Sequence, residues 1–240
     1  MKLDILAIGA HPDDVELGCA GTLAKEIHQG KSVGILDLTR GELGTRGSAE
    51  IRDKESAAAA KILNIKVREN LSFSDGFFIN DKHHQIEIIK IIRKYRPDVV
   101  FCNAVDDRHI DHPKASQLVS SSCFLSGLTK INTKLDGSNV FQEEWRPKFI
   151  YHYLQWKNIS PDVCVDISDF MPIKLKAVMA YESQFFKEGV NMKNTPISTK
   201  NFIDSVEYRA RDLGRLSGVD YAEGFTVERC PLVNSIFDLK

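Results

Sequence analysis

The chain has 240 residues, of which 42% are hydrophobic and 27% are charged, which is ordinary for a folded globular protein. A formal net charge of −1 excludes the strongly basic composition of proteins that bind nucleic acid or anionic membranes. The five cysteines are widely spaced and form no C-x-x-C pair, which argues against both a disulfide framework and a cysteine-type zinc site. With no leader and no apolar run long enough to cross a bilayer, we expect a cytoplasmic protein with no membrane or nucleic-acid partner.

The first predicted strand, residues 3–9, is followed at once by side chains that can bind a metal. His11, Asp13 and Asp14 come directly after its apolar run, and Pro12 stiffens the turn between them. Residues just past the carboxyl end of a parallel strand lie in the crevice where ligands bind. One carboxylate can therefore bind a cation beside the imidazole while the other stays free as a base. The alternative is that these residues only cap a helix.

Strands and helices then alternate along the chain. Apolar periodicity predicts helices at 15–28, 49–63, 84–95 and 113–125, and strands at 33–38, 67–73 and 99–103. This order predicts an α/β fold with a Rossmann-like, mostly parallel sheet, right-handed crossovers and helices on both faces. The glycine-rich loop after the second strand lacks G-x-x-x-x-G-K-[ST], which disfavours nucleotide binding there.

A second polar cluster follows the strand at 99–103. It contains Asp106, Asp107, Arg108, His109, Asp111 and His112. Because it too lies at the carboxyl end of a strand, it can meet the first cluster. Three nitrogen and oxygen ligands with an open fourth position are typical of catalytic zinc, whereas structural zinc usually has four protein ligands.

The remainder of the chain has a weaker pattern. We expect a polar surface loop at 129–144, strands at 149–154 and 163–167, a helix at 170–185, a mobile loop over the site at 187–200 and a helix at 202–216. No composition break or repeat separates these parts. We therefore expect one domain over 1–240, with a core at 1–128 completed by 145–240.

Two motifs together resemble a known family. Ala10-His11-Pro12-Asp13-Asp14, combined with His109-Ile110-Asp111-His112, is similar to the LmbE/PIG-L-like zinc-dependent N-acetylglucosamine deacetylases. Ile110 stands where many members have proline, a position that carries no chemistry. The stretches 38–47, 52–55 and 73–78 look most like the bacillithiol biosynthesis deacetylases within that family.

This resemblance implies metal-assisted amide hydrolysis and gives a role to each motif residue. Zn²⁺, or another divalent metal such as Fe²⁺, would polarise the acetyl carbonyl. The expected metal ligands are His11, Asp14 and His112. Asp13 is the expected general base. His109 is expected to donate to the oxyanion or to the leaving amine, and Asp111 is the carboxylate expected to orient His109.

The resemblance also implies a small N-acetylated sugar conjugate as substrate. In the bacillithiol enzymes it is N-acetylglucosaminyl-malate, whose two carboxylates suit the guanidinium groups of Arg52 and Arg108. Glu42 is a further candidate for hydrogen bonds to the sugar. For Arg52 the alternative is an ion pair with Glu50 or Glu55. Relatives of this type often assemble into trimers or hexamers, so we expect a homo-oligomer.

Two other interpretations stay open. The chain could hydrolyse a different amide, such as another acetylated sugar or a thiol conjugate. It could instead be a non-catalytic protein that binds a metal or a nucleotide. Gln184 could equally be a site residue or a structural group at a helix end.

Overall fold

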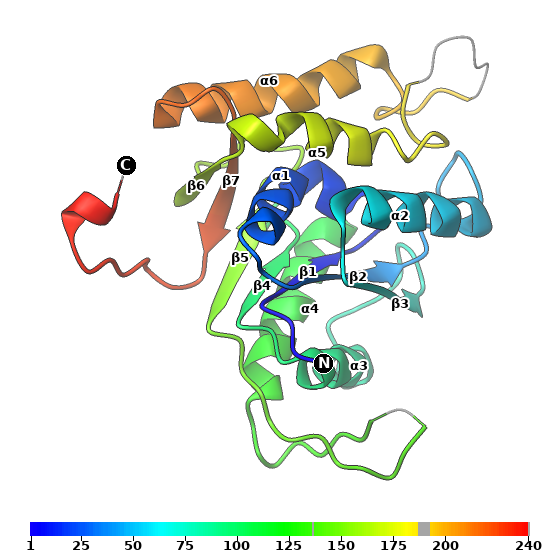
Figure 1. Ribbon diagram of the computed structural model, residues 1–240. Coiled ribbons are helices and arrows are strands. Elements are labelled where there is room, and N and C mark those ends of the chain that lie inside the picture. Colours follow the sequence, from blue (N-terminus) through cyan, green and yellow to red (C-terminus); the bar gives the residue numbers. More distant parts are fainter. Residues whose placement is uncertain (136, 187–192, 240) are drawn as a thin grey trace.

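A seven-stranded sheet runs through the molecule in this computed structural model, which describes residues 1–135, 137–186 and 193–239 (Figure 1). Its strands are β1 (Ile5–Gly9), β2 (Val33–Thr39), β3 (Val67–Phe73), β4 (Val99–Cys102), β5 (Phe149–Tyr153), β6 (Val163–Asp166) and β7 (Ala222–Val227). In the order β3-β2-β1-β4-β5-β7-β6, the first five strands are parallel and β7 is antiparallel to both neighbours. The prediction of a mostly parallel α/β sheet is confirmed.

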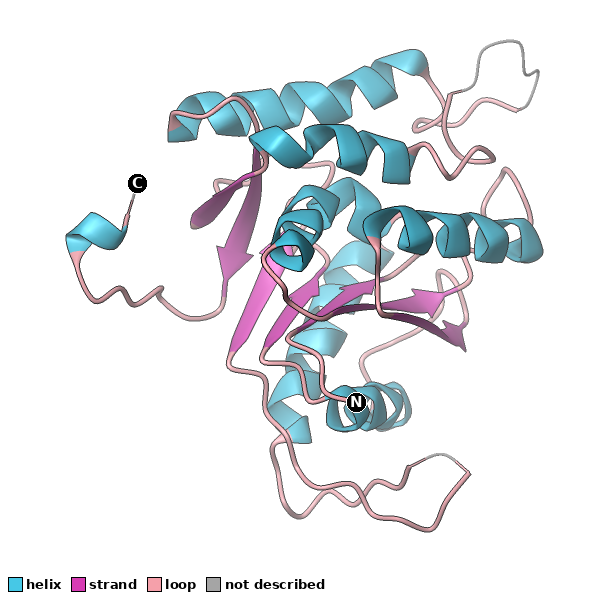
Figure 2. Cartoon of the chain, in the orientation of Figure 1, coloured by secondary structure: helices cyan, strands magenta, loops and turns pink. Residues whose placement is uncertain are grey.

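Helices cover both faces of this sheet (Figure 2). They are α1 (Asp14–His28), α2 (Ala49–Leu63), α3 (Lys82–Tyr95), α4 (Asp111–Ser126), α5 (Met171–Val178) and α6 (Lys200–Ser217). α3 packs on α4 at one face, whereas α1 and α2 lie with α5 at the other, and α6 packs beside β7. None of the described helices is long and apolar enough to cross a membrane.

The central strand β1 explains why the site is rigid. Its side chains alternate, so that Leu6 and Ile8 join the core under α3 and α4. Ile5 and Ala7 join the core under α1. Because β1 is buried on both faces, the turn that follows it starts from a fixed backbone.

The order of the strands brings the two polar clusters together. β1 pairs with β4 in parallel, with Ile5 opposite Val99 and Ala7 opposite Phe101. The crossovers run outward in opposite directions from this pair, which makes it the switch point of the sheet. The loops after β1 and β4 therefore open into the same crevice.

The helix expected at 170–185 is shorter than predicted, since α5 ends at Val178. The following turn is held by contacts with other segments. Ser183 donates its N–H and hydroxyl to the carboxylate of Glu55, at 2.6 and 2.7 Å. Gln184 donates to the carbonyl of Arg46 at 2.8 Å. These bonds fix an irregular chain path that helical periodicity could not reveal.

Strand β7 was not expected from the sequence. Its second residue, Glu223, is buried, which breaks the apolar pattern of a central strand. Lys174 pairs with this carboxylate at 2.5 Å, and the N–H groups of Gly21 and Thr22 donate to it. Contacts with other parts of the chain therefore stabilise a strand that its own sequence pattern does not predict.

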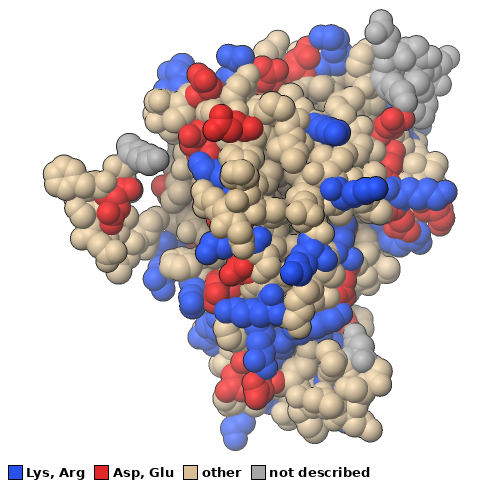
Figure 3. Space-filling view, in the orientation of Figure 1, with Lys and Arg blue, Asp and Glu red and all other residues tan. Residues whose placement is uncertain are grey.

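Two expected loops and the surface charge complete the description. The segment 129–144 contains one isolated bridge, Lys134 to Phe141, among its described residues. Of the loop expected at 187–200, residues 187–192 lie outside the described residues. Acidic and basic side chains are interspersed on the face shown in Figure 3, in keeping with the net charge of −1.

Candidate active site

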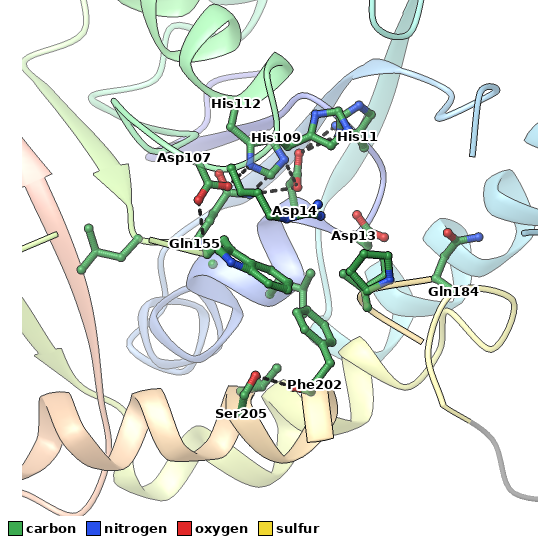
Figure 4. A pocket seen from close by; sticks show the side chains of 18 of the residues that line it. His11, Asp13, Asp14, Asp107, His109, His112, Gln155, Gln184, Phe202 and Ser205 are labelled. Atoms are coloured by element: carbon green, nitrogen blue, oxygen red, sulfur yellow. Dashed lines mark hydrogen bonds and ion pairs between the residues drawn. The ribbon is translucent and has the colours of Figure 1, made fainter. Parts of the chain in front are cut away.

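The carboxyl ends of β1 and β4 open into a cavity of about 450 Å³. Seven of the side chains singled out in the sequence line it: His11, Asp13, Asp14, Arg52, Arg108, His109 and His112. Gln184 lines it as well. Figure 4 shows the histidines and Asp14 gathered on one side of this cavity. The residues predicted to carry out the chemistry thus lie at the switch point of the sheet.

Asp14 lies at the centre of the predicted metal triad. Its Oδ2 is 3.4 Å from Nδ1 of His11, and its Oδ1 is 3.1 Å from Nε2 of His112. The amide groups of Asn103 and Gln155 donate to the same carboxylate at 3.0 and 2.9 Å. The structure therefore brings the three predicted ligands together in a buried cluster.

The second nitrogen of each of these two imidazoles faces a carboxylate. Nε2 of His11 lies 2.9 Å from Asp75, and Nδ1 of His112 forms a hydrogen bond with Asp107. Because an ionised carboxylate only accepts, the ring proton belongs on the nitrogen that faces it. The other nitrogens, Nδ1 of His11 and Nε2 of His112, face Asp14, and a divalent cation bound there would take the place of a ring proton between each of them and the carboxylate. Two imidazole nitrogens that converge with a carboxylate form a donor set that divalent cations bind.

His109 differs from these two histidines in its tautomer. Ring nitrogens of His11, His109 and His112 lie within 4.8 Å of one another, so distance alone would allow a third imidazole ligand. However, Nδ1 of His109 accepts the N–H of Asp111 at 3.3 Å. Burial lowers the pKa of His109, as do the other two rings. A neutral ring then carries its proton on Nε2, which makes His109 a donor.

The structure corrects the expected role of Asp111. Its carboxylate accepts the N–H of Gly76 at 2.7 Å and lies 3.4 Å from Nε2 of His11. Its contact with His109 comes from the main chain. The Asp111 carboxylate therefore orients His11, together with Asp75, whereas its backbone N–H orients His109.

The electrostatics of the cluster favour a bound cation. Burial alone would lower the pKa of His112, but Asp14 and Asp107 outweigh it and raise that pKa to about 9. The pKa of His11 is raised well above its usual value against the effect of burial, by Asp111, Asp14 and Asp75. Buried carboxylates thus require positive charge here. A divalent metal fits this donor set and this charge.

Asp13 has a different environment from its neighbour Asp14. Its backbone φ of 111° is in the left-handed region, which costs energy for a residue with a side chain. Its Oδ2 lies 2.9 Å from Nη2 of Arg52, which also donates to the carbonyl of Pro12. Burial raises the pKa of Asp13 to about 7 even though Arg52 lowers it. Arg52 therefore pairs with Asp13, and neither Glu50 nor Glu55 takes that place.

The glycine-rich loop covers this ion pair. Gly41 has a φ of 64°, and a Cβ at this position would collide with the guanidinium of Arg52. Leu43, which follows in the loop, lines the cavity. The carboxylate of Glu42 accepts the N–H of Asp75 at 2.8 Å. Glu42 thus holds the loop against the Asp75 turn in this structure.

Three polar residues of the site were not singled out in the sequence: Asp75, Asp107 as a partner of His112, and Gln155. They follow the carboxyl ends of β3, β4 and β5. Their position just after a strand end could have identified them, because the same rule predicted His11 and His112 as site residues. The partner of each side chain, however, depends on the strand order.

Comparisons with known proteins identify the family. Residues 6–123 match the PIG-L family, described as GlcNAc-PI de-N-acetylase. The chain is 31% identical to the diacetylchitobiose deacetylase of Thermococcus kodakarensis over 235 residues, covering 92% of this chain and 81% of that protein. The chain belongs to the PIG-L family of deacetylases. It is therefore a metal-dependent N-deacetylase.

Solved structures agree with this PIG-L assignment. A conserved protein from Thermus thermophilus has a TM-score of 0.85 and 38% identity, covering 98% of both chains. The N,N'-diacetylchitobiose deacetylase of Pyrococcus horikoshii has a TM-score of 0.76 and 28% identity, covering 93% of this chain and 82% of that one. The relatives whose names state a sugar substrate are thus diacetylchitobiose deacetylases, and these matches do not single out the bacillithiol type.

Proposed function

We propose that this PIG-L deacetylase uses zinc to remove the acetyl group from N-acetylglucosaminyl-L-malate, as in bacillithiol biosynthesis. One observation carries the catalytic part of the proposal. Nδ1 of His11 and Nε2 of His112 converge on the Asp14 carboxylate, and Asp13 lies beside them, ion-paired with Arg52. This arrangement combines a metal site with a separate base.

Each residue would contribute a defined step. Zinc held by His11, Asp14 and His112 would supply a Lewis acid that polarises the acetyl carbonyl and acidifies water. The Asp13 carboxylate accepts a proton from the water that attacks the carbonyl carbon. His109 donates the hydrogen of Nε2 to the acetyl oxygen as negative charge develops there. The C–N bond then breaks, and the proton from Asp13 passes to the leaving amine.

A second substrate has its own support. The relatives from Thermococcus kodakarensis and Pyrococcus horikoshii are named for diacetylchitobiose, which carries no carboxylate. The malate conjugate is supported instead by the exposed Arg108, which lines the cavity. The motif stretches 38–47 and 73–78 also resemble the bacillithiol enzymes.

The experiment couples metal analysis to an assay of free amine. Purified protein is analysed for zinc and iron, then incubated with N-acetylglucosaminyl-malate, diacetylchitobiose or N-acetylglucosamine. We expect about one zinc per chain, and a kcat/KM at least tenfold higher for the malate conjugate than for either neutral sugar. A preference for diacetylchitobiose would replace the malate assignment, and no amine release from any substrate would refute the proposed function.

A further inference from the structure

One side of the cavity is formed by a stripe of α6. Side chains at helical spacing line it there, namely Phe202, Ser205, Val206, Arg209, Ala210 and Leu213. Figure 4 shows Phe202 and Ser205 across the cavity from the histidine cluster. Arg209 is the one charged side chain in this stripe, and no sequence motif singled it out.

The cations that line the cavity fall into two groups. Arg52 is paired with Asp13 at 2.9 Å, and Lys174 is paired with Glu223 at 2.5 Å. Arg108 and Arg209 have no carboxylate within 4.0 Å among the residues that the structure describes. Two guanidinium groups in one substrate cavity are thus left without a counter-ion.

Trp156 connects these two arginines. The guanidinium carbon of Arg108 lies 4.5 Å from the centre of the Trp156 ring, a cation–π contact. Arg209 donates to the carbonyl of Trp156 at 3.3 Å, a long hydrogen bond to a neutral group. Both guanidinium groups therefore lie around one residue, and among the described residues their other N–H groups have no hydrogen-bond partner.

Asp107, the acid whose charge acts on Arg209, is already engaged. Burial lowers the pKa of Arg209, and Asp107 opposes that effect only in part. The Asp107 carboxylate accepts from His112 and from the N–H groups of Trp156 and Lys157. It is thus committed to orienting the metal site. A half-buried guanidinium with one long hydrogen bond and no carboxylate partner is costly unless an anion enters the cavity.

We propose that Arg209, together with Arg108, binds a carboxylate of the group linked to the sugar and selects anionic conjugates over neutral N-acetylglucosaminides. This inference rests on the proposed function, and it names Arg209 as the residue that determines which conjugates the enzyme accepts. A guanidinium binds a carboxylate through two parallel hydrogen bonds, which gives direction as well as affinity. Arg209 lines the same cavity as His11, Asp14 and His112, so the group linked to the sugar can reach Arg209 when the amide lies at the proposed metal site.

The test compares Arg209→Gln with Arg215→Gln. Arg215 lies on the same helix, but it is exposed and paired with Asp212. For Arg209→Gln we expect kcat/KM on N-acetylglucosaminyl-malate to fall at least tenfold, mainly through KM. Activity on the neutral methyl N-acetylglucosaminide should stay within twofold of wild type, which also shows that the variant folds. Arg215→Gln should leave kcat/KM on both substrates unchanged. Arg209→Lys should retain part of the kcat/KM on N-acetylglucosaminyl-malate that Arg209→Gln loses.

Calorimetric titration with L-malate separates this inference from the proposed function. If Arg209→Gln loses malate binding while the wild type hydrolyses none of the sugars, the subsite stands and the proposed function fails. Malate binding or kcat/KM on the conjugate that is unchanged in Arg209→Gln would overturn the inference. An equal fall of kcat/KM on both substrates would show a structural role and would overturn it as well.

Discussion

At the scale of single residues, two adjacent aspartates take different parts because the backbone turns between them. Asp14 is the first residue of α1, and its carboxylate faces the imidazoles. Asp13 has a φ of 111°, which directs its side chain to Arg52 instead. We infer a functional reason for this strained backbone, because it keeps one carboxylate out of the proposed metal site.

Replacing Asp13 by Asn should separate catalysis from metal binding. The amide keeps the shape of the side chain but cannot accept the proton of water, so kcat should fall on the order of 100-fold or more. Metal content should remain near that of the wild type, because the side chain faces Arg52. Elemental analysis and the amine assay on the same preparation check both expectations.

The matched variant is Asp14→Asn, which we expect to lose metal and activity together. Should Asp13→Asn lose its metal as well, Asp13 would be a ligand and the assignment of a free base would be wrong.

At the scale of secondary structure elements, the site could be predicted where chemistry follows directly from a strand end. The sequence placed His11 after the first strand and His112 after the fourth, and the parallel pairing of β1 with β4 joins them. The residues that orient these histidines could not be assigned in this way. Asp75 follows β3, an edge strand of the sheet, and only the turn at 74–76 brings it to His11.

The second half of the fold was harder to predict for a related reason. Its elements are stabilised by contacts with the first half more than by their own pattern. The turn after α5 is held by Ser183 on Glu55, and β7 contains the buried Glu223. Arg209 likewise lies in an amphipathic helix that the sequence predicts, but its position in the cavity depends on how that helix packs.

Asp107 and its neighbour Asp106 offer a test of the orienting carboxylates. Asp107 is buried and bonded to His112, whereas Asp106 is exposed and pairs with Lys157. Asp107→Asn should weaken metal affinity about 10- to 100-fold, because the amide oxygen stays with the N–H groups of Trp156 and Lys157 and the NH2 group then faces Nδ1 of His112, which loses its acceptor. Competition with a chromophoric chelator measures this affinity.

Asp106→Asn changes the same charge one residue away and should leave metal affinity unaltered. Equal effects of the two variants would mean that the charge of the loop matters rather than the hydrogen bond to His112.

At the scale of the whole molecule, the cavity is built from two parts of the chain, and the proposed carboxylate site joins Arg108 from one part to Arg209 from the other. The expected ligands, base and donor all come from residues 11–112, at the ends of β1 and β4. The wall of the cavity opposite them comes from α6, which the chain adds after β5 and β6. Substrate preference within the family could therefore change through α6 without disturbing the metal site.

The two parts meet at β5, where a buried histidine connects three strands. Nδ1 of His152 lies 3.2 Å from the sulfur of Cys102 in β4 and 3.1 Å from the carbonyl of Asn103. Its Nε2 lies 3.1 Å from the carboxylate of Glu228, which follows β7. Burial opposes protonation, but these three groups outweigh it and raise the pKa of His152 to about 10.

This shift predicts how stability depends on pH. The folded state holds the proton on His152 more tightly than the unfolded state, whose pKa is near 6.5. The stabilisation is therefore complete below about pH 6.5 and is lost as the pH rises through about 10. Because Glu228 is partly exposed, solvent reduces the effect, and we expect a loss of about 1 kcal/mol or more between pH 6 and pH 9.5.

Urea unfolding of the wild type and of His152→Gln at the two pH values measures this contribution. The difference in unfolding free energy between them should shrink at pH 9.5, since only the wild type has the proton to lose. The exposed His83 provides the control, and His83→Gln should follow the wild type at both values. A difference that stays constant with pH would show that His152 is neutral in the folded protein and joins the strands by packing alone.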